Sequence, residues 1–356
     1  MEQARAILPD NSQDLFDSAI GRVAPGTPLR QAIDMIISAQ NGALICIGDV
    51  KAVLAIGNGG FRIDLPFTPQ RLFELSKMDG AIVLSDDGAQ IICANFHLNP
   101  DPSLITQETG MRHRSAARTS AQTESIVIAI SKRRVQTTIY RNGQALTLDP
   151  DDILLSKSNQ GILALQNAKN NLEKAAIRQS FIELDDLVTA VDVANVLTRY
   201  VNLIGLAAHT ERFINYLGNN SGLLRNQLDE IMHGVTESFL LTVRDYATTA
   251  SAKEAKKIAR ALLKIPRGEL DVQSIMRALG FNDPVADEDR LHPRGFRVMS
   301  RISMLDEAAT SRIIEEYGLL SALVSDSKEG FDRLDNAGID NVRAIAASFR
   351  QLRSTL

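Results

Sequence analysis

The chain has 356 residues, of which 44% are hydrophobic and 23% charged, with few aromatic residues and no tryptophan. This composition is typical of a globular protein with two or three domains and a mostly aliphatic core. The formal net charge of −4 excludes a global positive field, so binding of nucleic acid would have to come from a local patch.

The two cysteines, Cys46 and Cys93, lie in apolar, strand-like runs, so we expect both to be buried. Two cysteines supply neither a four-cysteine zinc site nor a disulfide framework. The first twenty residues mix charges throughout, and no window reaches the apolar length of a membrane span. We therefore expect a cytoplasmic protein without membrane contact.

The first 149 residues alternate helical and strand patterns. Helices are expected over residues 1–20, after Thr27-Pro28 and after Thr68-Pro69, where a threonine can cap the helix and a proline opens it. Strands are expected at the apolar runs 43–47, 53–56, 82–84, 89–96, 125–131, 135–140 and 144–148. This order predicts an α/β domain, with a mixed sheet flanked by helices.

Strand patterns disappear between residues 153 and 281, where apolar residues recur at helical spacing. We interpret this region as an all-α spine that spaces and assembles the protein. Short helices follow, with a glycine-containing turn at residues 338–341. A helix, a hairpin and a second helix can grip a phosphate backbone without reading bases. The predicted domains are therefore 1–149 (α/β), 150–285 (helical spine) and 286–356 (a small helix-hairpin-helix domain).

Residues 109–118 place three arginines, a histidine and two hydroxyl side chains around Gly110. A helix that begins here would combine free backbone amides with fixed positive charge, which favours a phosphate site. A solvated helix start whose arginines pair with nearby acids is the alternative. Because His113 stands between two arginines, we expect it to be neutral, as a hydrogen-bonding group or a metal ligand.

Asp79 lies just before a predicted strand and is followed by Gly80. A carboxylate beside a glycine that permits close backbone approach suits Mg²⁺ held against phosphates, although a plain turn explains the pair equally simply. A metal carboxylate facing a cationic stretch is what phosphoryl and nucleotidyl transfer require. The glycine-rich residues 57–60 lack the ending of a P-loop and the dinucleotide fingerprint, so we favour a tight connection there.

Asp79-Gly80-Ala81 together with Arg112-His113-Arg114 resembles the motif pair of diadenylate cyclases. The three-part layout resembles one branch of that family, the DNA-integrity scanning proteins, over the whole chain. The resemblance implies condensation of two ATP into cyclic di-AMP with release of two pyrophosphates, dependent on Mg²⁺ or Mn²⁺. It also implies two cyclase domains placed face to face within a homo-octamer, and binding of DNA, including branched DNA, by the C-terminal domain.

The resemblance also assigns roles by position. Catalysis would rest on Asp79 as the metal ligand and on Arg112, His113 and Arg114. The ATP-binding set would be Gly80, Ala81, Leu98, Met111, Arg112, His113, Arg114, Ser115 and Ser131. The DNA-binding set would be Arg294, Arg297, Arg301, Gly338 and Arg343.

Three positions depart from the pattern of that family. Met111 stands where threonine is usual, Ala117 where an acidic residue is frequent, and Asp340 where the last hairpin usually has a second glycine. Because methionine offers ATP no hydroxyl, we expect weaker binding or a slower reaction rather than loss of activity. An aspartate at a phosphate-facing turn is unfavourable, and acids slightly outnumber bases from residue 286 onward, so little counterion release is expected.

Three hypotheses follow from the sequence. The favoured one is a metal-dependent diadenylate cyclase coupled to the sensing of DNA structure. The second, motivated by Met111 and Ala117, is a nucleotide-gated sensor that binds DNA junctions and is catalytically weak or inactive. The third is a structural oligomer held together by the helical spine.

Overall fold

The computed structural model of the protein describes residues 14–249, 251–302, 305–329, 347 and 351. The chain divides into two compact units, and the division falls within one long helix, between Ser158 and Asn159. Of the described residues, the sheet unit comprises 14–158 together with 212–223, and the helical unit comprises 159–211 and those from 224 onward. Among the described residues, no helix combines the length and the apolar character needed to cross a membrane.

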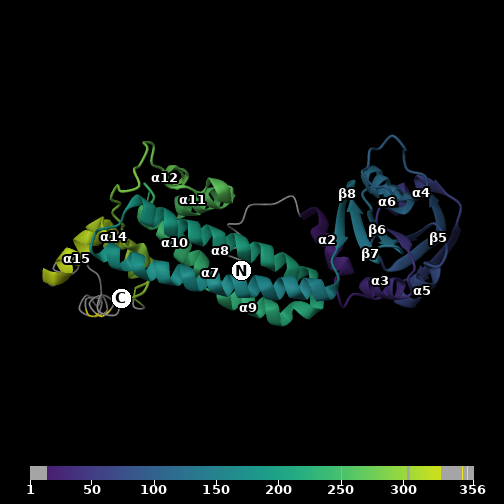
Figure 1. Ribbon diagram of the computed structural model, residues 1–356, viewed down its shortest axis with the longest axis horizontal. Coiled ribbons are helices and arrows are strands. Elements are labelled where there is room, and N and C mark those ends of the chain that lie inside the picture. Colours follow the sequence, from purple (N-terminus) through teal and green to yellow (C-terminus); the bar gives the residue numbers. More distant parts are fainter. Residues whose placement is uncertain (1–13, 250, 303–304, 330–346, 348–350, 352–356) are drawn as a thin grey trace. The chain divides into compact units, whose positions relative to one another are not determined.

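The sheet unit is built around a mixed sheet of eight strands (Figure 1). The strands are β1 (Ala43–Ile47), β2 (Gly57–Asn58), β3 (Phe61–Pro66), β4 (Ala81–Leu84), β5 (Gln90–Leu98), β6 (Ile126–Ser131), β7 (Gln136–Arg141) and β8 (Gln144–Leu148). Their order is β2-β5-β4-β1-β6-β7-β8, and β3 also pairs with β5. β1 and β4 are parallel, whereas β1 pairs with β6 in antiparallel register. The predicted mixed sheet is thus confirmed.

Helices cover both faces of this sheet. α2 (Asp14–Val23), α3 (Pro28–Ser38) and α5 (Pro69–Leu75) pack on one face, where Ile45 of β1 is buried. α4 (Val50–Ala55) and α6 (Met111–Gln122) pack on the other face, where Cys46 is buried. Because successive strand residues point to opposite faces and both faces are covered, β1 is apolar throughout its length.

Most local predictions in the sheet unit are confirmed, with one clear correction. Thr27 and Thr68 cap α3 and α5 by accepting hydrogen bonds from backbone amides, as their sequences predict. The predicted strand at 53–56 is wrong, because residues 50–55 form α4 and bury Val53 on one side. A short apolar run is compatible with either structure. β3 is an additional strand, which the sequence did not reveal because five of its six residues are exposed.

The helical unit contains no named strand among its described residues, which confirms the predicted all-α region. Its helices are the later part of α7 (Asp151–Leu184), most of α8 (Ala190–Tyr216), most of α9 (Gly222–Met232), α10 (Val235–Tyr246), α11 (Ala252–Lys264), α12 (Val272–Leu279), α13 (Phe296–Met299), α14 (Glu307–Tyr317) and α15 (Leu320–Glu329). Two short 3₁₀ turns lie at Gly218–Ser221 in the sheet unit and Arg267–Glu269 in the helical unit.

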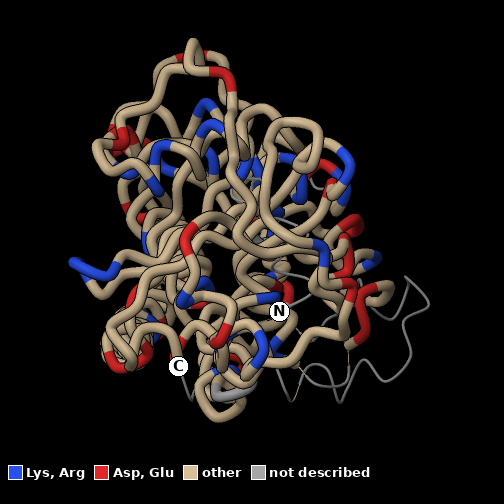
Figure 2. The backbone as a smooth tube through the Cα atoms, turned by 90° about the vertical axis from the view of Figure 1, so that its right-hand side faces the viewer, with Lys and Arg blue, Asp and Glu red and all other residues tan. Residues whose placement is uncertain are grey.

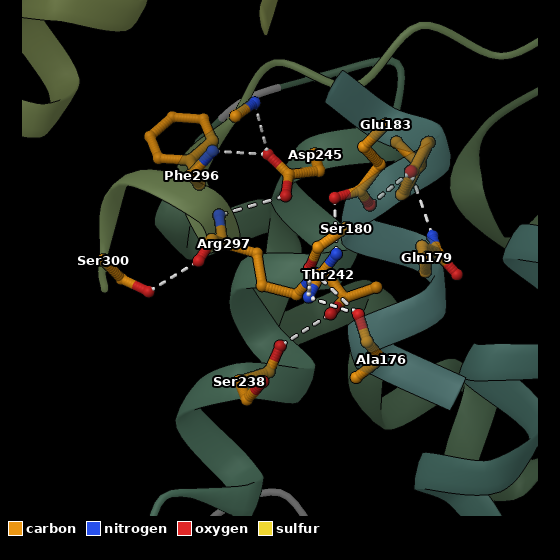
Figure 3. A network of polar contacts seen from close by, with 12 residues as sticks. Ala176, Gln179, Ser180, Glu183, Ser238, Thr242, Asp245, Phe296, Arg297 and Ser300 are labelled. Carbon is orange, nitrogen blue, oxygen red and sulfur yellow. Dashed lines mark hydrogen bonds and ion pairs between the residues drawn. The ribbon is translucent and has the colours of Figure 1, made fainter. Parts of the chain in front are cut away.

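A buried polar network joins α7, α10 and α13 (Figure 3). Asp245 accepts hydrogen bonds from the backbone amides of Gly295 at 2.8 Å, Phe296 at 2.6 Å and Arg297 at 3.1 Å. The guanidinium of Arg297 pairs with Glu183, and both side chains are almost inaccessible to solvent. α13 is therefore capped and its arginine neutralised by carboxylates from α10 and α7.

The predicted boundary between residues 285 and 286 stays a prediction. The following segment belongs to the helical unit, where Leu184 of α7 shares a core with Val298, Ile313 and Leu320. Asp245 and Glu183 bind its first helix as described above. The predicted hairpin at 338–341 lies outside the described residues.

Candidate functional site

One edge of the sheet gathers the residues singled out in the α/β domain. At this edge lie the amino ends of the parallel strands β1 and β4 and the carboxyl ends of their antiparallel neighbours β6 and β5. Asp79 and Gly80 immediately precede β4, Leu98 ends β5, and Ser131 ends β6. α/β sheets usually bind ligands at the carboxyl ends of parallel strands, whereas here the antiparallel strands supply the carboxyl ends.

The turn before β4 has a backbone that only glycine satisfies. Gly80 has a φ of +84°, and a Cβ there would lie 2.8 Å from the carbonyl carbon of Asn95 and 2.9 Å from the amide nitrogen of Phe96. The side-chain amide of Asn95 donates to the backbone carbonyl of Asp79 at 3.0 Å. β5 thus holds this turn in place and fixes the position of the Asp79 backbone, from which the carboxylate extends.

The carboxylate of Asp79 is exposed and has no hydrogen-bond or ion-pair partner among the residues that the structure describes. Within the same described ranges, no three His, Cys, Asp or Glu side chains gather as a protein-only metal site. Mg²⁺ is commonly held by one or two carboxylates together with the phosphates of a substrate. The residues present therefore fit a divalent cation that is shared between Asp79 and a nucleotide.

The amino end of α6 lies at the same sheet edge. Gly110 is its N-cap residue, no side chain caps the helix, and its first turn contains no acidic residue. The guanidinium of Arg112 approaches the end of β6, with Nη1 3.4 Å from the carbonyl oxygen of Ile130. A Cβ on Gly42, just before β1, would lie 2.3 Å from the same Nη1 atom. Gly42 thus leaves the space that Arg112 occupies between β1 and β6.

The other two arginines of α6 hold the loop that precedes the helix. Arg114 donates to the carbonyl oxygens of Glu108 at 3.4 Å and Thr109 at 3.3 Å. Arg118 donates to the carbonyl oxygens of Leu104 at 2.9 Å and Pro102 at 2.8 Å. Since a guanidinium carries five N–H donors, these bonds leave Arg114 able to bind an anion as well.

His113 faces the interior of the sheet unit. Its Nδ1 atom lies 2.8 Å from the hydroxyl of Tyr140 on β7, and that hydroxyl donates to Oε1 of Glu108 at 2.8 Å. Burial lowers the pKa of His113, and the guanidinium groups of Arg134 and Arg112 lower it further, whereas Glu108 opposes them. Burial, followed by the Glu108 carboxylate, raises the pKa of Tyr140. These effects favour the neutral imidazole, and burial contributes more to them than the arginines on which the sequence-based expectation rested.

The remaining predicted ATP contacts lie around this edge in different environments. Met111 is 77% exposed at the first position of α6, and Ala81 is fully buried in β4, so only its backbone can meet a ligand. Ser115 and Leu98 are half-buried. The Ser131 hydroxyl accepts a hydrogen bond from the backbone amide of Arg134 at 3.3 Å.

Ala117 belongs to the buried core beneath α6, with 4% of its surface exposed. An unpaired acidic side chain placed there would cost several kcal/mol of desolvation, of order 1–3 kcal/mol even when partly compensated. Alanine at this position therefore fits the packing beneath α6.

The structure corrects the prediction that Arg297 contacts DNA. This side chain is 2% exposed and paired with Glu183, so it cannot reach a phosphate backbone. Arg294 donates to the carbonyl oxygens of Arg244 and Ala247 at the end of α10, where it satisfies free carbonyl groups. Arg301 is exposed in a turn. The two other predicted contacts, Gly338 and Arg343, lie outside the described residues.

Four residues of the site carry no sequence signal that would have identified them. Gly42 has the pattern of a helix stop, Tyr140 that of a core aromatic residue, and Asn95 and Glu108 those of ordinary polar residues. Their roles depend on partners that are distant in the chain, such as Tyr140 for His113. Only the folded arrangement brings these residues together.

Positive charge at this edge is local. Figure 2 shows Lys and Arg interspersed with Asp and Glu along the chain, in keeping with the small net charge. Attraction of an anion to this edge would therefore draw on local groups, among them Arg112, Arg114 and the uncapped amides of α6. An open carboxylate and such a cationic helix end at one sheet edge of an α/β domain would suit the phosphates of a nucleotide.

Comparison with known proteins identifies the family. A family model described as the DisA bacterial checkpoint controller nucleotide-binding region matches residues 30–145, and one described as the linker region matches residues 148–287. The DNA integrity scanning protein DisA of Symbiobacterium thermophilum is 39% identical over 95% of this chain and 96% of its own length. That of Carboxydothermus hydrogenoformans is 37% identical over 94% and 96%. The chain therefore belongs to the DisA family of diadenylate cyclases, which are nucleotidyltransferases.

This assignment confirms the family resemblance drawn from the sequence. Among solved structures, DacA from Staphylococcus aureus is 19% identical and covers 40% of this chain and 93% of its own, with a TM-score of 0.30. That likeness is slight, and the assignment rests on the family models and on the relatives in sequence.

Proposed function

We propose that the protein condenses two ATP into cyclic di-AMP and two pyrophosphates. In each of the two equivalent steps, the 3′-oxygen of one ATP forms a bond to the α-phosphorus of the other. The bond to the pyrophosphate breaks, and the hydroxyl proton is released. The observation that carries this proposal is the single sheet edge where an unpartnered Asp79 carboxylate, the Arg112 guanidinium and the uncapped amides of α6 lie together.

Each residue of this edge has a defined role in the proposal. Asp79 would hold Mg²⁺ or Mn²⁺ together with phosphate oxygens, and the cation would neutralise charge on the reacting phosphates. Arg112, Arg114 and the first amides of α6 would bind the phosphates, since these groups are the donors at the edge. Gly80, Ala81, Met111, Ser115, Leu98 and Ser131 would border the nucleotide. The protein then contributes chiefly by positioning and by electrostatic stabilisation.

The reaction requires two copies of the sheet unit. One edge offers one carboxylate and one cationic helix end, whereas the product contains two newly formed phosphodiester bonds. Two edges placed face to face would let each ATP present its α-phosphate to the hydroxyl of the other. We therefore propose a homo-oligomer, an octamer in the pattern of the family, acting in the cytoplasm. Its specific activity should fall when the protein is diluted below the concentration at which the oligomer dissociates.

The test is a direct product assay on the full chain. Incubation with ATP and Mn²⁺ or Mg²⁺, followed by chromatography, should yield cyclic di-AMP and pyrophosphate in a ratio of one to two. The control substrate 3′-deoxy-ATP lacks the attacking hydroxyl and should bind without reacting. Absence of cyclic di-AMP at every protein concentration, with ATP binding intact, would exclude the cyclase.

A nucleotide-gated DNA sensor without turnover is the second candidate, and Met111 is the observation that favours it. The exposed methionine offers no hydroxyl at the first position of α6. Membership in the DisA family supports DNA binding by the C-terminal part of the chain, where Arg301 is the exposed arginine of the predicted set. Salt-dependent binding of branched DNA without ATP consumption would favour the sensor, whereas cyclic di-AMP formation excludes it.

A further inference from the structure

A chain of three side chains leads from the ATP site into the core of the sheet unit. Glu108 belongs to the loop before α6, Tyr140 to β7 and His113 to the first turn of α6. The Glu108 carboxylate and the Nδ1 atom of His113 both lie 2.8 Å from the single hydroxyl of Tyr140. Arg114 and Arg118 hold the loop that carries Glu108 through backbone carbonyl groups. The acid at the end of this chain is thus fixed by the same helix that carries the histidine.

The Tyr140 hydroxyl has a single proton, and the partner that accepts it determines the tautomer of His113. An ionised carboxylate only accepts hydrogen bonds, so the single hydroxyl proton is donated to Glu108. The short contact with His113 must then use a proton on Nδ1, donated to the tyrosine oxygen. In a neutral imidazole the other nitrogen, Nε2, therefore carries a lone pair and acts as a hydrogen-bond acceptor.

Nε2 of His113 is buried and has no hydrogen-bond partner among the described residues. Leaving a buried acceptor unsatisfied costs about 1–3 kcal/mol, so such atoms are rare unless a ligand completes them. Gly110 is the residue beside the ring edge that bears Nε2. A Cβ on Gly110 would lie 3.7 Å from Cδ2, the carbon bonded to Nε2, and Gly110 itself is exposed. A ligand at the amino end of α6 would approach from that side.

We propose that Glu108 and Tyr140 are positioning residues that hold His113 as its Nδ1–H tautomer, so that Nε2 accepts a hydrogen bond from a ribose hydroxyl of bound ATP. The inference rests on the proposed function, because it assumes that a nucleotide occupies this edge. ATP carries donors only on its ribose and its adenine amino group, and the phosphates belong with Arg112 and Arg114. A neutral acceptor between these arginines therefore suits the hydroxyl nearest to the phosphates. In this proposal the three side chains Glu108, Tyr140 and His113 form a relay. His113 is then a hydrogen-bond acceptor whose direction is fixed, and not only a member of a cationic motif.

The tautomer can be tested without any turnover. Magic-angle-spinning NMR of the full chain labelled with ¹⁵N-histidine separates protonated from unprotonated ring nitrogens, and a His113→Asn sample identifies the His113 signals among those of the five histidines. The proposal expects a proton on Nδ1 and none on Nε2 at pH 8. A proton on Nε2 instead of Nδ1 would overturn it. This readout stays valid if the cyclase assay fails, so the two failures are distinguishable.

Two variants test the relay in catalysis. Tyr140→Phe removes the acceptor of Nδ1–H, and Glu108→Ala frees the Tyr140 hydroxyl to donate to Nδ1, which favours the opposite tautomer. Each should lower kcat by about 10–100-fold, the usual cost of losing a supporting partner, and should raise KM for ATP by about 5-fold, because the hydroxyl contact is lost. Glu108 is half-buried in a mostly exposed loop, so Glu108→Ala keeps the test available if Tyr140→Phe does not fold. Wild-type kcat in a folded Glu108→Ala protein would overturn the proposal.

The matched control and the nucleotide analogues separate positioning from stability. Tyr200→Phe removes an equally buried tyrosine hydroxyl, which bonds Ser238 in the helical unit, and should leave kcat unchanged. In binding assays, wild-type protein should lose about 5-fold or more in affinity for either 2′-deoxy-ATP or 3′-deoxy-ATP. Glu108→Ala should bind both analogues and ATP alike. Equal discrimination in wild type and variant would contradict the hydroxyl contact.

Discussion

Two helices of this protein begin with a glycine followed two residues later by an arginine, and their surroundings give them opposite roles. In the sheet unit, Gly110 precedes α6, no side chain caps the helix, and Arg112 lies at an open sheet edge. In the helical unit, Gly295 precedes α13, Asp245 occupies the amides of the first turn, and Arg297 is paired with Glu183. One helix end offers charge to a ligand and the other has its charge fully used by the fold.

The difference lies in residues remote from either helix. Asp245 is about fifty positions from α13 and Glu183 more than a hundred, whereas the acid nearest along the chain to the amino end of α6, Glu108, bonds to Tyr140 instead of the helix amides. A local pattern of glycine and arginine therefore indicates only the potential for an anion site. Whether a distant carboxylate already fills the helix end decides between a binding site and a structural joint.

The largest expected effect comes from removing the buried guanidinium of Arg297, which stabilises the helical unit. Arg297→Met leaves the buried carboxylates of Glu183 and Asp245 without their cation, and breaking a buried pair in this way costs about 3–5 kcal/mol. Hydrogen exchange of α7 and α13 amides in the full chain should report this loss in the helical unit. The matched variant Arg112→Met should leave exchange in α6 within a few tenths of a kcal/mol while removing cyclase activity. A change below about 1 kcal/mol for Arg297→Met would contradict the structural role.

Asp79→Asn should have the next largest effect, on rate alone. The substitution removes the charge that would hold the cation, and we expect a fall in kcat of about 100–1,000-fold, comparable to loss of a transition-state stabilising group. Because this carboxylate has no partner among the described residues, the free energy of unfolding should change by less than about 0.5 kcal/mol. Cyclic di-AMP is measured by chromatography and stability by urea unfolding. Asp86→Asn, in an exposed hairpin turn at the other end of β4, is the control and should keep full activity.

The sequence predicts the parts of the fold that depend on local signals. Threonine caps, proline starts and continuous apolar runs located α3, α5, β1 and β6 because each signal lies within a few residues of the element it determines. The short run at 53–56 was ambiguous, since a buried helix turn and a buried strand have the same composition there. β3 could not be predicted from the sequence, because its side chains are mostly exposed and its pairing with β5 leaves no periodic apolar pattern.

For the site, as for the fold, the sequence predicts only the parts that depend on local signals. Asp79, Gly80 and the Arg112–Arg114 run could be singled out from residue types alone, because charge and glycine conformations act locally. The space that Gly42 leaves for Arg112, the support that Asn95 gives to Asp79 and the relay through Tyr140 require the register of β1, β5, β6 and β7. For the same reason the burial of Arg297 could not be foreseen, since its partners come from two other helices.

A smaller effect is expected from the space beside Arg112. Gly42→Ala places a Cβ about where Nη1 of Arg112 now lies, so the guanidinium must move from the end of β6. We expect kcat/KM to fall by about 10-fold, since small displacements of positioning groups cost one to two orders of magnitude. Gly21→Ala is the matched control, because a Cβ there meets nothing within 4 Å. Equal kcat/KM in the two variants would show that the placement of Arg112 has no catalytic importance.

The smallest expected effect, and the only gain, concerns Met111. Its side chain is exposed at the first position of α6, so substitution there leaves the core of the sheet unit untouched. Met111→Thr supplies the hydroxyl usual in the family, and one added hydrogen bond of about 0.5–1.5 kcal/mol would raise kcat/KM by about 2–10-fold. Met111→Val has the same shape as threonine without the hydroxyl, so it separates hydrogen bonding from loss of the methionine. If valine raises kcat/KM as much as threonine, the methionine obstructs the nucleotide. If neither changes it, the open end of α6 already binds phosphate through its amides and arginines, and the contrast with the capped α13 rests on those groups alone.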